Sequence, residues 1–317
     1  MGGPQTHYSV MLEESIEWLR IRPDGLYLDC TAGLGGHTRA IAMRLVTGKV
    51  IARDWDRDSL ELCRANTEDL IQGSGASRIE YSWGRFSDLG EVLGRQSNPE
   101  ATNRKRVDGL LADLGVSRYQ LTSADRGFSL QADGPLDMRA DRSQERTAAD
   151  IVNFTSEREL ADLIYELGEE RRSRRAARAI VAARPIRSTG HLARVIEEAM
   201  PRTGKTHPAT QTFLALRLAV SGELEELDAL LAQLPDVVAP GGRVVIISFM
   251  STEDRKVKRA FQALAREGKA RLLTKHVVIP GEQELRDNAA SRSAKLRALE
   301  MVGGESQEET GYGVGGG

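Results

Sequence analysis

Three aspartates that each follow a short apolar run are the side chains best placed to do chemistry in this chain. Asp29, Asp54 and Asp113 end segments of the type that forms buried parallel strands. In an open α/β sheet, ligands bind beyond the carboxyl ends of the strands. The pattern therefore predicts one crevice that all three carboxylates face.

A glycine-rich turn follows the first of these aspartates. Gly33, Gly35 and Gly36 separate the apolar run 26–28 from an amphipathic helix expected over 38–46. Glycine lets a ligand approach the backbone closely, and the unpaired N–H groups of a helix N-terminus attract an anionic or polar group. The segment predicts a nucleotide-cofactor pocket; the alternative is a strand, turn and helix with incidental glycines.

The spacing of the glycines distinguishes between cofactors. A dinucleotide-binding loop has the pattern G-x-G-x-x-G, in which Gly33 and Gly35 fit but the third position falls on Thr38. Asp54 follows at the distance where such folds place the acid that accepts the ribose hydroxyls. The combination indicates S-adenosylmethionine, with Asp29 as a candidate partner for its ammonium group.

The turn after Asp113 is the expected place of the reaction. In methyltransferases that modify exocyclic amines, this turn holds the target amine against the methyl group. The lone pair of an aromatic amine is delocalised, and hydrogen bonds from its N–H groups to a carboxylate or carbonyl localise it. Asp113 and Ser117 are the candidate catalytic residues, with the carbonyls of Leu114 and Gly115 as other acceptors. The alternatives for Asp113 are ordering of the turn and binding of cofactor.

Composition excludes several classes of protein. The chain has 317 residues, 40% of them hydrophobic, and a formal net charge of −2, which predicts a globular protein with one large or two moderate cores. No apolar run approaches the ~20 residues that span a bilayer, and no signal peptide is recognisable, so a cytoplasmic protein without membrane contact is expected. Two cysteines and five scattered histidines fit neither a disulfide framework nor a zinc site, and we expect no metal.

One segment is strongly basic although the chain is not. Residues 171–187 contain seven arginines and no acid among helix-forming alanines. On a helix, one face would carry Arg171, Arg174, Arg175 and Arg178. Such a stripe is able to follow the phosphates of a nucleic acid. The alternative is a solvated helix whose arginines pair with Glu169 and Glu170.

A long polar loop over 118–141 follows the turn after the fourth strand. Loops of more than ~12–15 residues in compact domains are commonly functional. Phe128, flanked by Arg126, is expected to stack on an extruded base, with Arg139 as a second substrate contact. His207 is a further candidate for substrate contact near a domain boundary. The alternative for the loop is a linker between domains.

The order of expected elements predicts the fold class. Strands over 26–28, 49–54, 78–83 and 107–113 alternate with helices over 38–46, 59–71 and 86–93, with a polar connector over 96–106. Such alternation indicates a doubly wound parallel sheet. It stops between about 121 and 212, where the chain is polar and then helical. It resumes with a helix over 213–234, a turn at 240–242, a central strand over 243–249, a helix over 252–267 and edge strands over 270–275 and 277–279.

These elements predict a discontinuous domain organisation. Residues 1–120 and 213–302 form the expected cofactor-binding domain. Residues 121–212 form an inserted helical domain that recognises substrate. Residues 303–317 are glycine-rich without a face that packs, and a disordered tail is expected.

Several motifs together resemble the bacterial ribosomal RNA small-subunit methyltransferase H family, also called MraW. The motifs are residues 7–13, 29–37, 113–117, 125–129, 134–139, 168–171, 207–210, 247–249, 253–255 and 291–295. Two positions depart from the family pattern. Met250 stands where the family usually has His, and Asn288-Ala289-Ala290 replaces Asn-Pro-Arg.

The resemblance implies an α/β, Rossmann-like class I methyltransferase sheet with an inserted helical domain. It also implies methylation of the N(4) amine of a cytosine in 16S ribosomal RNA, within the small subunit, by S-adenosylmethionine. By resemblance, the cofactor contacts are Gly35, Gly36, His37, Asp54, Phe86, Asp113 and Gln120. The candidate substrate contacts are Phe128, Arg139, Arg171, Arg174, Arg175 and His207. The alternatives are a nicotinamide-dependent oxidoreductase and a non-catalytic ribosome assembly factor, and an oligomer is compatible with each.

Overall fold

A seven-stranded mixed sheet is the centre of the larger part of the molecule. Its strands are β1 (Leu26–Asp29), β2 (Lys49–Asp54), β3 (Ile79–Trp83), β4 (Val107–Asp113), β5 (Val238–Ser248), β6 (Ala270–Leu272) and β7 (Lys295–Met301). The strand order is β3-β2-β1-β4-β5-β7-β6, in which β7 runs antiparallel to both of its neighbours and the other pairs are parallel. The expected α/β, Rossmann-like sheet is confirmed.

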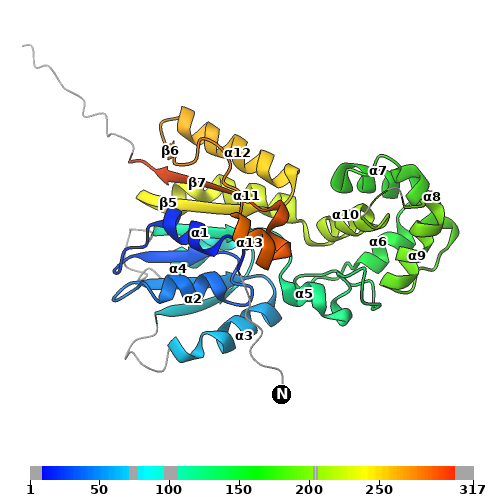
Figure 1. Cartoon of the computed structure of the whole chain (residues 1–317), viewed down its shortest axis with the longest axis horizontal. Coiled ribbons are helices and arrows are strands. Elements are labelled where there is room, and N and C mark those ends of the chain that lie inside the picture. The colour runs from blue at the N-terminus through cyan, green and yellow to red at the C-terminus, as the bar shows by residue number, and fades with distance from the viewer. Residues whose placement is uncertain (1–8, 71–77, 96–105, 203, 205, 304–317) are drawn as a thin grey trace, which may run out of the picture.

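Helices cover the sheet and form a second group beside it (Figure 1). They are α1 (Leu12–Leu19), α2 (Gly36–Ala42), α3 (Arg57–Asn66), α4 (Leu89–Arg95), α5 (Arg118–Thr122), α6 (Ala148–Phe154), α7 (Glu157–Gly168), α8 (Ser173–Ala182), α9 (Thr189–Ala199), α10 (Thr210–Ser221), α11 (Glu223–Val237), α12 (Ser251–Arg266) and α13 (Glu282–Asp287). The computed structural model describes residues 9–70, 78–95, 106–202, 204 and 206–303. Most of the expected connector (96–106) and tail (303–317) therefore lies outside the described residues.

Alternate residues of the central strands pack on opposite faces of the sheet. Leu110 and Ala112 of β4 lie in the core formed with α4, α11 and α12, whereas Leu111 lies in the core formed with α1 and α2. Because both faces are covered, the consecutive residues Leu110, Leu111 and Ala112 are all apolar, which explains the continuous apolar run of the sequence.

A separate core is built from helices and the long loop after β4. Residues of α6 to α10 pack around the buried side chains of Phe128, Leu136 and Met138, which belong to the long loop after β4. Phe213 and Leu216 of α10 also lie in this core. The helical group therefore includes α10, which the sequence analysis assigned to the sheet domain. Among the described residues of 121–212 there is no strand, as expected.

The structure corrects the boundaries of several elements. The single helix expected over 213–234 is two helices, α10 and α11, which meet at Gly222 with φ 66°. Glycine in this left-handed conformation is the usual end of a helix. The turn expected at 240–242 lies inside β5, where the register between β4 and β5 shifts. Among residues 277–279, only Val278 pairs, in a single bridge to Leu296.

Three elements near the chain termini were not predicted at all. They are α1, α13 and β7. Strand β7 inserts between β5 and β6 as the antiparallel member of the sheet. Its sequence is short and contains Lys295, Arg297 and Glu300, so neither an apolar run nor a strict alternation marks it.

Candidate active site at the carboxyl edge of the sheet

The glycine loop between β1 and α2 has a backbone suited to close approach of a ligand. Gly33 and Gly35 have φ values of 51° and 90°, in the left-handed region that favours glycine. A Cβ atom at Gly36 would collide with the hydroxyl of Ser9. His37 follows in the first turn of α2, where it is buried with Nε2 3.2 Å from the carbonyl oxygen of Val10. The loop and the start of α2 are therefore fixed in one conformation.

Asp54 at the end of β2 holds this loop in place. Its Oδ2 accepts a hydrogen bond from the Gly33 N–H at 2.8 Å, and its Oδ1 accepts one from the Asp56 N–H at 2.9 Å. Burial raises the pKa of Asp54 to about 7. Each carboxylate oxygen has a second lone pair, so the group retains capacity to accept hydrogen bonds from a ligand.

Asp29 at the end of β1 has a different environment from that expected. The side chain has no exposed surface, its Oδ2 accepts a hydrogen bond from Thr38 Oγ1 at 2.6 Å, and its Oδ1 accepts one from the Thr31 N–H at 3.2 Å. Burial raises its pKa to about 6. Asp29 therefore links the loop to α2, and the structure does not support its expected contact with the ammonium group of a ligand.

Asp113 lies at the end of β4, beside the glycine loop. Its backbone N–H donates to Thr31 Oγ1 at 2.7 Å, and its Oδ2 is 4.0 Å from His37 Nδ1. Its Oδ1 is buried and accepts no hydrogen bond from the residues that the structure describes. A buried polar atom without a partner costs free energy, so this oxygen is suited to a ligand that donates a hydrogen bond.

Burial, and then three neighbouring acids, control the ionisation of Asp113. Burial raises its pKa well above the ordinary range, and Asp29, Glu253 and Glu284 raise it further. Glu253 accepts hydrogen bonds from the backbone N–H groups of Phe249 and Met250 at 2.9 and 3.0 Å. Glu284 of α13 accepts one from Met11 at 2.8 Å. Burial and the three neighbouring acids therefore make Asp113 hold a proton more firmly than an exposed aspartate does.

Sequence reasoning gave no role to Glu253 and Glu284. Glu253 is the third residue of α12, a position from which Glu often accepts hydrogen bonds from the backbone before the helix, so a partial local signal existed although Met250 does not cap the helix. No local signal relates Glu284 to Asp113, because the two are far apart in the sequence. Position 250 contributes its backbone N–H to Glu253, a contact that any residue except proline makes.

An aromatic surface lies beside Asp54. The rings of Trp55 and Phe86 are stacked with their planes 7° apart and their centroids 6.2 Å apart. Phe86 is partly buried against the core under α4 and α11. Trp55 directly follows Asp54 in the chain but was not among the predicted site residues. The pair provides the flat apolar surface that a planar ring system requires.

Ser117 and Gln120 support the turn after β4 from within the protein. The Gln120 Oε1 accepts a hydrogen bond from the Ser117 N–H at 2.8 Å, and Ser117 Oγ accepts one from the Gln120 N–H at 3.3 Å. The pair forms a capping box at the start of α5. Gln120 Nε2 donates to Asp56 at 2.7 Å. Ser117 is thus a helix cap, and the structure does not support the catalytic role expected for it.

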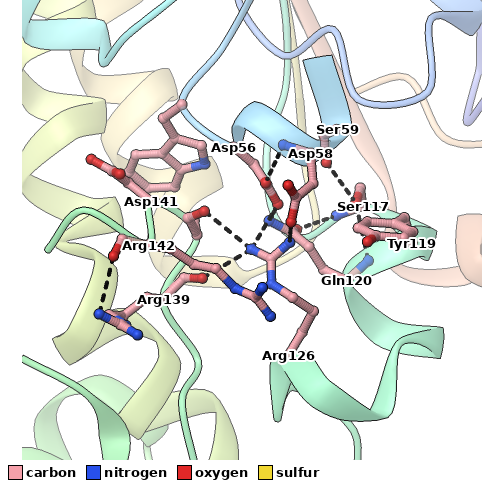
Figure 2. Close-up of polar contacts among 12 residues, drawn as sticks. Asp56, Asp58, Ser59, Ser117, Tyr119, Gln120, Arg126, Arg139, Asp141 and Arg142 are labelled. Carbon is pink, nitrogen blue, oxygen red and sulfur yellow. Dashed lines mark hydrogen bonds and ion pairs between the residues drawn. The ribbon is translucent and has the colours of Figure 1, made fainter. Parts of the chain in front are cut away.

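Arg126 is the centre of a buried polar network (Figure 2). Its side chain has no exposed surface and lies 2.9 Å from Asp56 Oδ2 and 3.3 Å from Asp58 Oδ2. It also donates to the carbonyl oxygens of Arg139 and Ala140 at 3.0 and 3.1 Å. Arg126 therefore links the start of α3 to the loop that leads into the helical group.

Two residues of the long loop that were expected to bind substrate are engaged inside the protein. Phe128 is only 7% exposed and lies in the helical core, with the Arg126 guanidinium 5.9 Å from its ring. It has no free face for an extruded base. Arg139 makes two hydrogen bonds to Asp137, at 2.7 and 2.9 Å, and donates to the carbonyls of Arg142 and Gln144. The burial of Phe128 does not fit the expected stacking on a base, whereas the expected contact of Arg139 with substrate stays a prediction.

His207 also makes local contacts. Its Nδ1 accepts a hydrogen bond from the Ala209 N–H at 3.1 Å, and its Nε2 lies 3.6 Å from Glu197 at the end of α9. These contacts lie within the helical group and at the start of α10. The structure therefore gives His207 a structural environment and does not bring it to the aspartates.

Three arginines differ from all these side chains, namely Arg174 and Arg175 of α8 and Arg171, which lies in the turn before that helix. Arg171, Arg174 and Arg175 are exposed and form no ion pair with any residue that the structure describes. Arg178 lies 3.5 Å from Glu157, and Glu170 pairs with Arg172 instead of with the stripe. The alternative, in which neighbouring acids neutralise the stripe, therefore does not hold for these three arginines.

Two further searches covered the described part of the chain. It contains no group of three or more His, Cys, Asp or Glu side chains able to hold a metal ion. None of its helices is long and apolar enough to cross a membrane. A surface groove of about 550 Å³ between α11 and α12 contains none of the expected site residues.

Comparison with known proteins decides the family. Residues 4–302 match the MraW methylase family. The chain is 57% identical over 295 residues to ribosomal RNA small subunit methyltransferase H of Solibacter usitatus, with 93% of this chain and 99% of that protein covered. It is 49% identical over 298 residues to the protein of the same name from Koribacter versatilis, with 92% and 93% covered. The chain belongs to the MraW methylase family.

Membership of the MraW methylase family confirms an enzyme that transfers a methyl group from S-adenosylmethionine. The nicotinamide-dependent oxidoreductase is a poorer fit to these findings. The residues at the sheet edge suit this cofactor. The loop leaves its backbone open to close approach at Gly33, Asp54 keeps lone pairs for hydroxyl groups, and Asp113 holds an unpartnered acceptor.

Proposed function

We propose that this MraW methylase methylates the N(4) amine of a cytosine in 16S ribosomal RNA, within the small ribosomal subunit and in the cytoplasm. The observation that carries the proposal is the buried Oδ1 of Asp113, which has no partner among the described residues. It lies at the end of a central strand, where an amine donor would satisfy it. The relatives named above, both ribosomal RNA small subunit methyltransferases, supply the substrate class.

The proposed cofactor contacts divide into backbone and side-chain contacts. Gly35, Gly36 and His37 contribute the backbone of the loop and the start of α2, which holds the polar methionyl end. Asp54 accepts the ribose hydroxyls, and Phe86 with its neighbour Trp55 lies against the adenine. Gln120 supports the site indirectly. It donates a hydrogen bond to the side chain of Asp56, and the backbone N–H of Asp56 donates to Asp54.

The proposed chemistry assigns two roles to Asp113. When bound, S-adenosylmethionine supplies a methyl group on a positively charged sulfur. Asp113 accepts a hydrogen bond from the cytosine amine, which localises the nitrogen lone pair and orients it. The nitrogen must lose a proton when it gains the methyl group, and the ionised Asp113 takes it. Because burial and the neighbouring acids raise its pKa, the carboxylate is a stronger base than an exposed aspartate.

We assign recognition of the RNA to the helical group. It has a core separate from the sheet, and the exposed arginines of the stripe, Arg171, Arg174 and Arg175, lie on it. Unpaired cations on an exposed helix bind phosphates through release of counterions. The two-domain division expected from the sequence, 121–212 against the remainder, is kept in this proposal, with α10 added to the helical domain.

The experiment that tests the function uses small subunits from a strain that lacks this methylase. Purified protein, tritiated S-adenosylmethionine and the subunits are incubated, and the labelled nucleoside is identified by mass spectrometry. The expected product is N(4)-methylcytidine at one position of 16S ribosomal RNA. Label on a carbon atom, on another base, or absent from RNA despite cofactor binding would contradict the proposal. The last outcome would favour a non-catalytic assembly factor.

A further inference from the structure

The imidazole of His37 faces the carboxylate of Asp113 from the start of α2. Its Nδ1 lies 4.0 Å from Asp113 Oδ2. Only 5% of the His37 side chain is exposed, against 22% of the Asp113 side chain. A ligand at the sheet edge therefore contacts Asp113 directly and reaches the imidazole only through it. The proposed cofactor contact of His37 uses its backbone, which leaves the role of the ring to be explained.

The backbone carbonyl of Val10 determines which ring nitrogen faces Asp113 with a lone pair. His37 Nε2 lies 3.2 Å from this carbonyl oxygen. A carbonyl oxygen accepts hydrogen bonds and does not donate them, so Nε2 is the nitrogen that carries a hydrogen atom. In the neutral imidazole, Nδ1 then has the lone pair. The basic nitrogen of the ring is thus the one that faces Asp113.

The segment that contains Val10 is itself held in place. The N–H of Met11 donates to Glu284 of α13 at 2.8 Å, and the Met11 side chain has no exposed surface. The hydroxyl of Ser9 packs so closely on Gly36 that a Cβ atom there would collide with it. The carbonyl of Val10 is therefore a fixed acceptor, and it holds the imidazole in one orientation.

Asp113 requires a basic neighbour because it holds a proton firmly. Burial raises its pKa well above the ordinary range, and Asp29, Glu253 and Glu284 are the acids among the described residues that raise it further. A protonated carboxyl group has one oxygen that donates and one that accepts. A lone pair beside Oδ2 favours the proton on that oxygen, so Oδ1 stays an acceptor for an amine.

We propose that His37 is a positioning residue that accepts a hydrogen bond from Asp113 Oδ2 and then takes its proton during methyl transfer. The separation of 4.0 Å exceeds a hydrogen bond by about 1 Å, and catalytic contacts commonly shorten when the substrate binds. The proposal rests on the proposed function, because that function makes Asp113 the acceptor of the amine proton.

The atoms and charges of the step balance. A bond forms between the amine nitrogen and the methyl carbon, the bond from this carbon to sulfur breaks, and its electron pair stays on sulfur. The nitrogen releases a proton to Asp113 Oδ1, while the proton on Oδ2 moves to His37 Nδ1. The positive charge thus passes from sulfur to the imidazole, and Asp113 holds one proton before and after the step.

His37→Gln separates the two ring nitrogens. The Gln amide nitrogen lies near the place of Nε2 and still donates to Val10, but Gln has no basic nitrogen at the place of Nδ1. The single-turnover rate on small subunits should fall about 100-fold at pH 7, the lower limit typical of proton transfer by a positioned side chain. Cofactor affinity, measured by calorimetry, should stay within a few-fold because the backbone contact remains.

The dependence of the rate on pH distinguishes this role from a structural one. Without the imidazole, Asp113 must lose its own proton to the solvent before it accepts another, while the acids around it are unchanged. The rate of His37→Gln should therefore rise with pH through a midpoint higher than that of the wild type, and the loss should shrink at alkaline pH. A structural role would lower the rate by the same factor at every pH.

His191→Gln is the matched control. The Nδ1 of His191 in α9 accepts a hydrogen bond from the Arg187 N–H at 3.3 Å, away from the sheet edge. This variant should keep the rate and the pH profile of the wild type. Nitrogen-15 NMR of the wild-type chain tests the tautomer without any substitution. At pH 8, His37 should carry its hydrogen atom on Nε2, and the reverse tautomer would overturn the proposal.

Three results for His37→Gln would overturn this inference alone. They are an unchanged rate, a loss that is equal at all pH values, and a loss that weaker cofactor binding accounts for. Wild-type protein that labels no cytosine amine would instead overturn the proposed function, and the inference with it. Because the wild type is measured first on the same subunits, the two failures are distinguishable.

Discussion

The carboxyl edge of the sheet and the outer face of α8 use charged side chains in opposite ways. At the sheet edge, Asp29, Asp54 and Asp113 are held by the fold, and burial raises the pKa of each. On α8, Arg174 and Arg175 are exposed and have no ion pair with the described residues. The ionisation of the aspartates at the sheet edge therefore depends on their surroundings in the fold, whereas the two arginines of α8 remain available to bind a charged partner.

This difference in burial indicates that the sheet edge controls the rate of the reaction and that α8 controls the affinity for RNA. An electrostatic interaction is strong where water is excluded, so a buried carboxylate can direct a proton or a lone pair. Exposed arginines act through a field that salt screens within about 10 Å, and they attract any polyanion. Substitutions at the sheet edge should therefore change rates and pH dependence, whereas substitutions on α8 should change affinity and salt dependence.

The largest effect is expected at Asp113. Asp113→Asn keeps the shape of the side chain but removes the proton acceptor, and it should lower the rate of methyl transfer about 10²- to 10⁴-fold. Single-turnover rates with tritiated cofactor, together with cofactor affinity by calorimetry, measure this. Ser117→Ala is the control, because Ser117 caps α5 and its loss should leave the rate within a few-fold. Equal rates in wild type and Asp113→Asn would place the chemistry elsewhere.

The next effect is a loss of stability, and it is expected at Arg126, which lies between the two regions. Arg126→Met leaves Asp56 buried without its ion partner and should lower the free energy of unfolding by about 3–5 kcal/mol. Arg142→Met is the matched control, because its pair with Asp125 is exposed and should contribute about 0–1 kcal/mol. Urea unfolding followed by circular dichroism gives both values. Similar losses in the two variants would show that the Arg126 network contributes no more to stability than an exposed ion pair does.

A smaller effect with a distinct pH signature is expected at Asp54. Its pKa is raised to about 7, so the folded protein holds a proton that the unfolded chain releases near pH 4. This group therefore destabilises the fold as the pH rises from about 4 to about 7. Ribose hydroxyls bind best to the ionised form, so cofactor affinity should rise through about pH 7.

Asp54→Asn tests that effect directly. The variant should bind S-adenosylmethionine about 10- to 100-fold more weakly at pH 8, the range for loss of a charged hydrogen bond. The rise in affinity through about pH 7 should also disappear. Calorimetric titrations between about pH 6 and pH 8 measure both quantities. A rise of the same size in Asp54→Asn would assign the titration to another carboxylate, such as Asp29.

The smallest effect is expected on α8. The double variant Arg174→Ala with Arg175→Ala should lower RNA affinity about tenfold at low salt and reduce the salt slope by about 1 to 2. Cofactor affinity and the rate at saturating RNA should not change, because these side chains do not lie at the sheet edge. Binding measured over a series of salt concentrations provides the slope. A slope equal to that of the wild type would mean that the two arginines are simply solvated.

Sequence reasoning succeeded where the signal is local and failed where it depends on contacts between distant segments. The glycine loop with Asp54 was predicted because strand, turn and helix follow one another within a short stretch. Phe128 was predicted on the surface because its neighbours in the loop are polar. The structure buries it, since α6 to α10 supply the apolar contacts that the local sequence does not reveal.

The sequence by itself determined the family, the parallel core of the sheet, the position of the glycine loop and the basic character of α8. These follow from apolar runs, glycine spacing and local charge, which do not depend on the rest of the chain. Only the tertiary structure decided that Arg126 is internal, that Glu253 and Glu284 raise the pKa of Asp113, and that Phe154 is exposed. Burial and electrostatic environment arise when distant segments meet, and those contacts are absent from any local pattern.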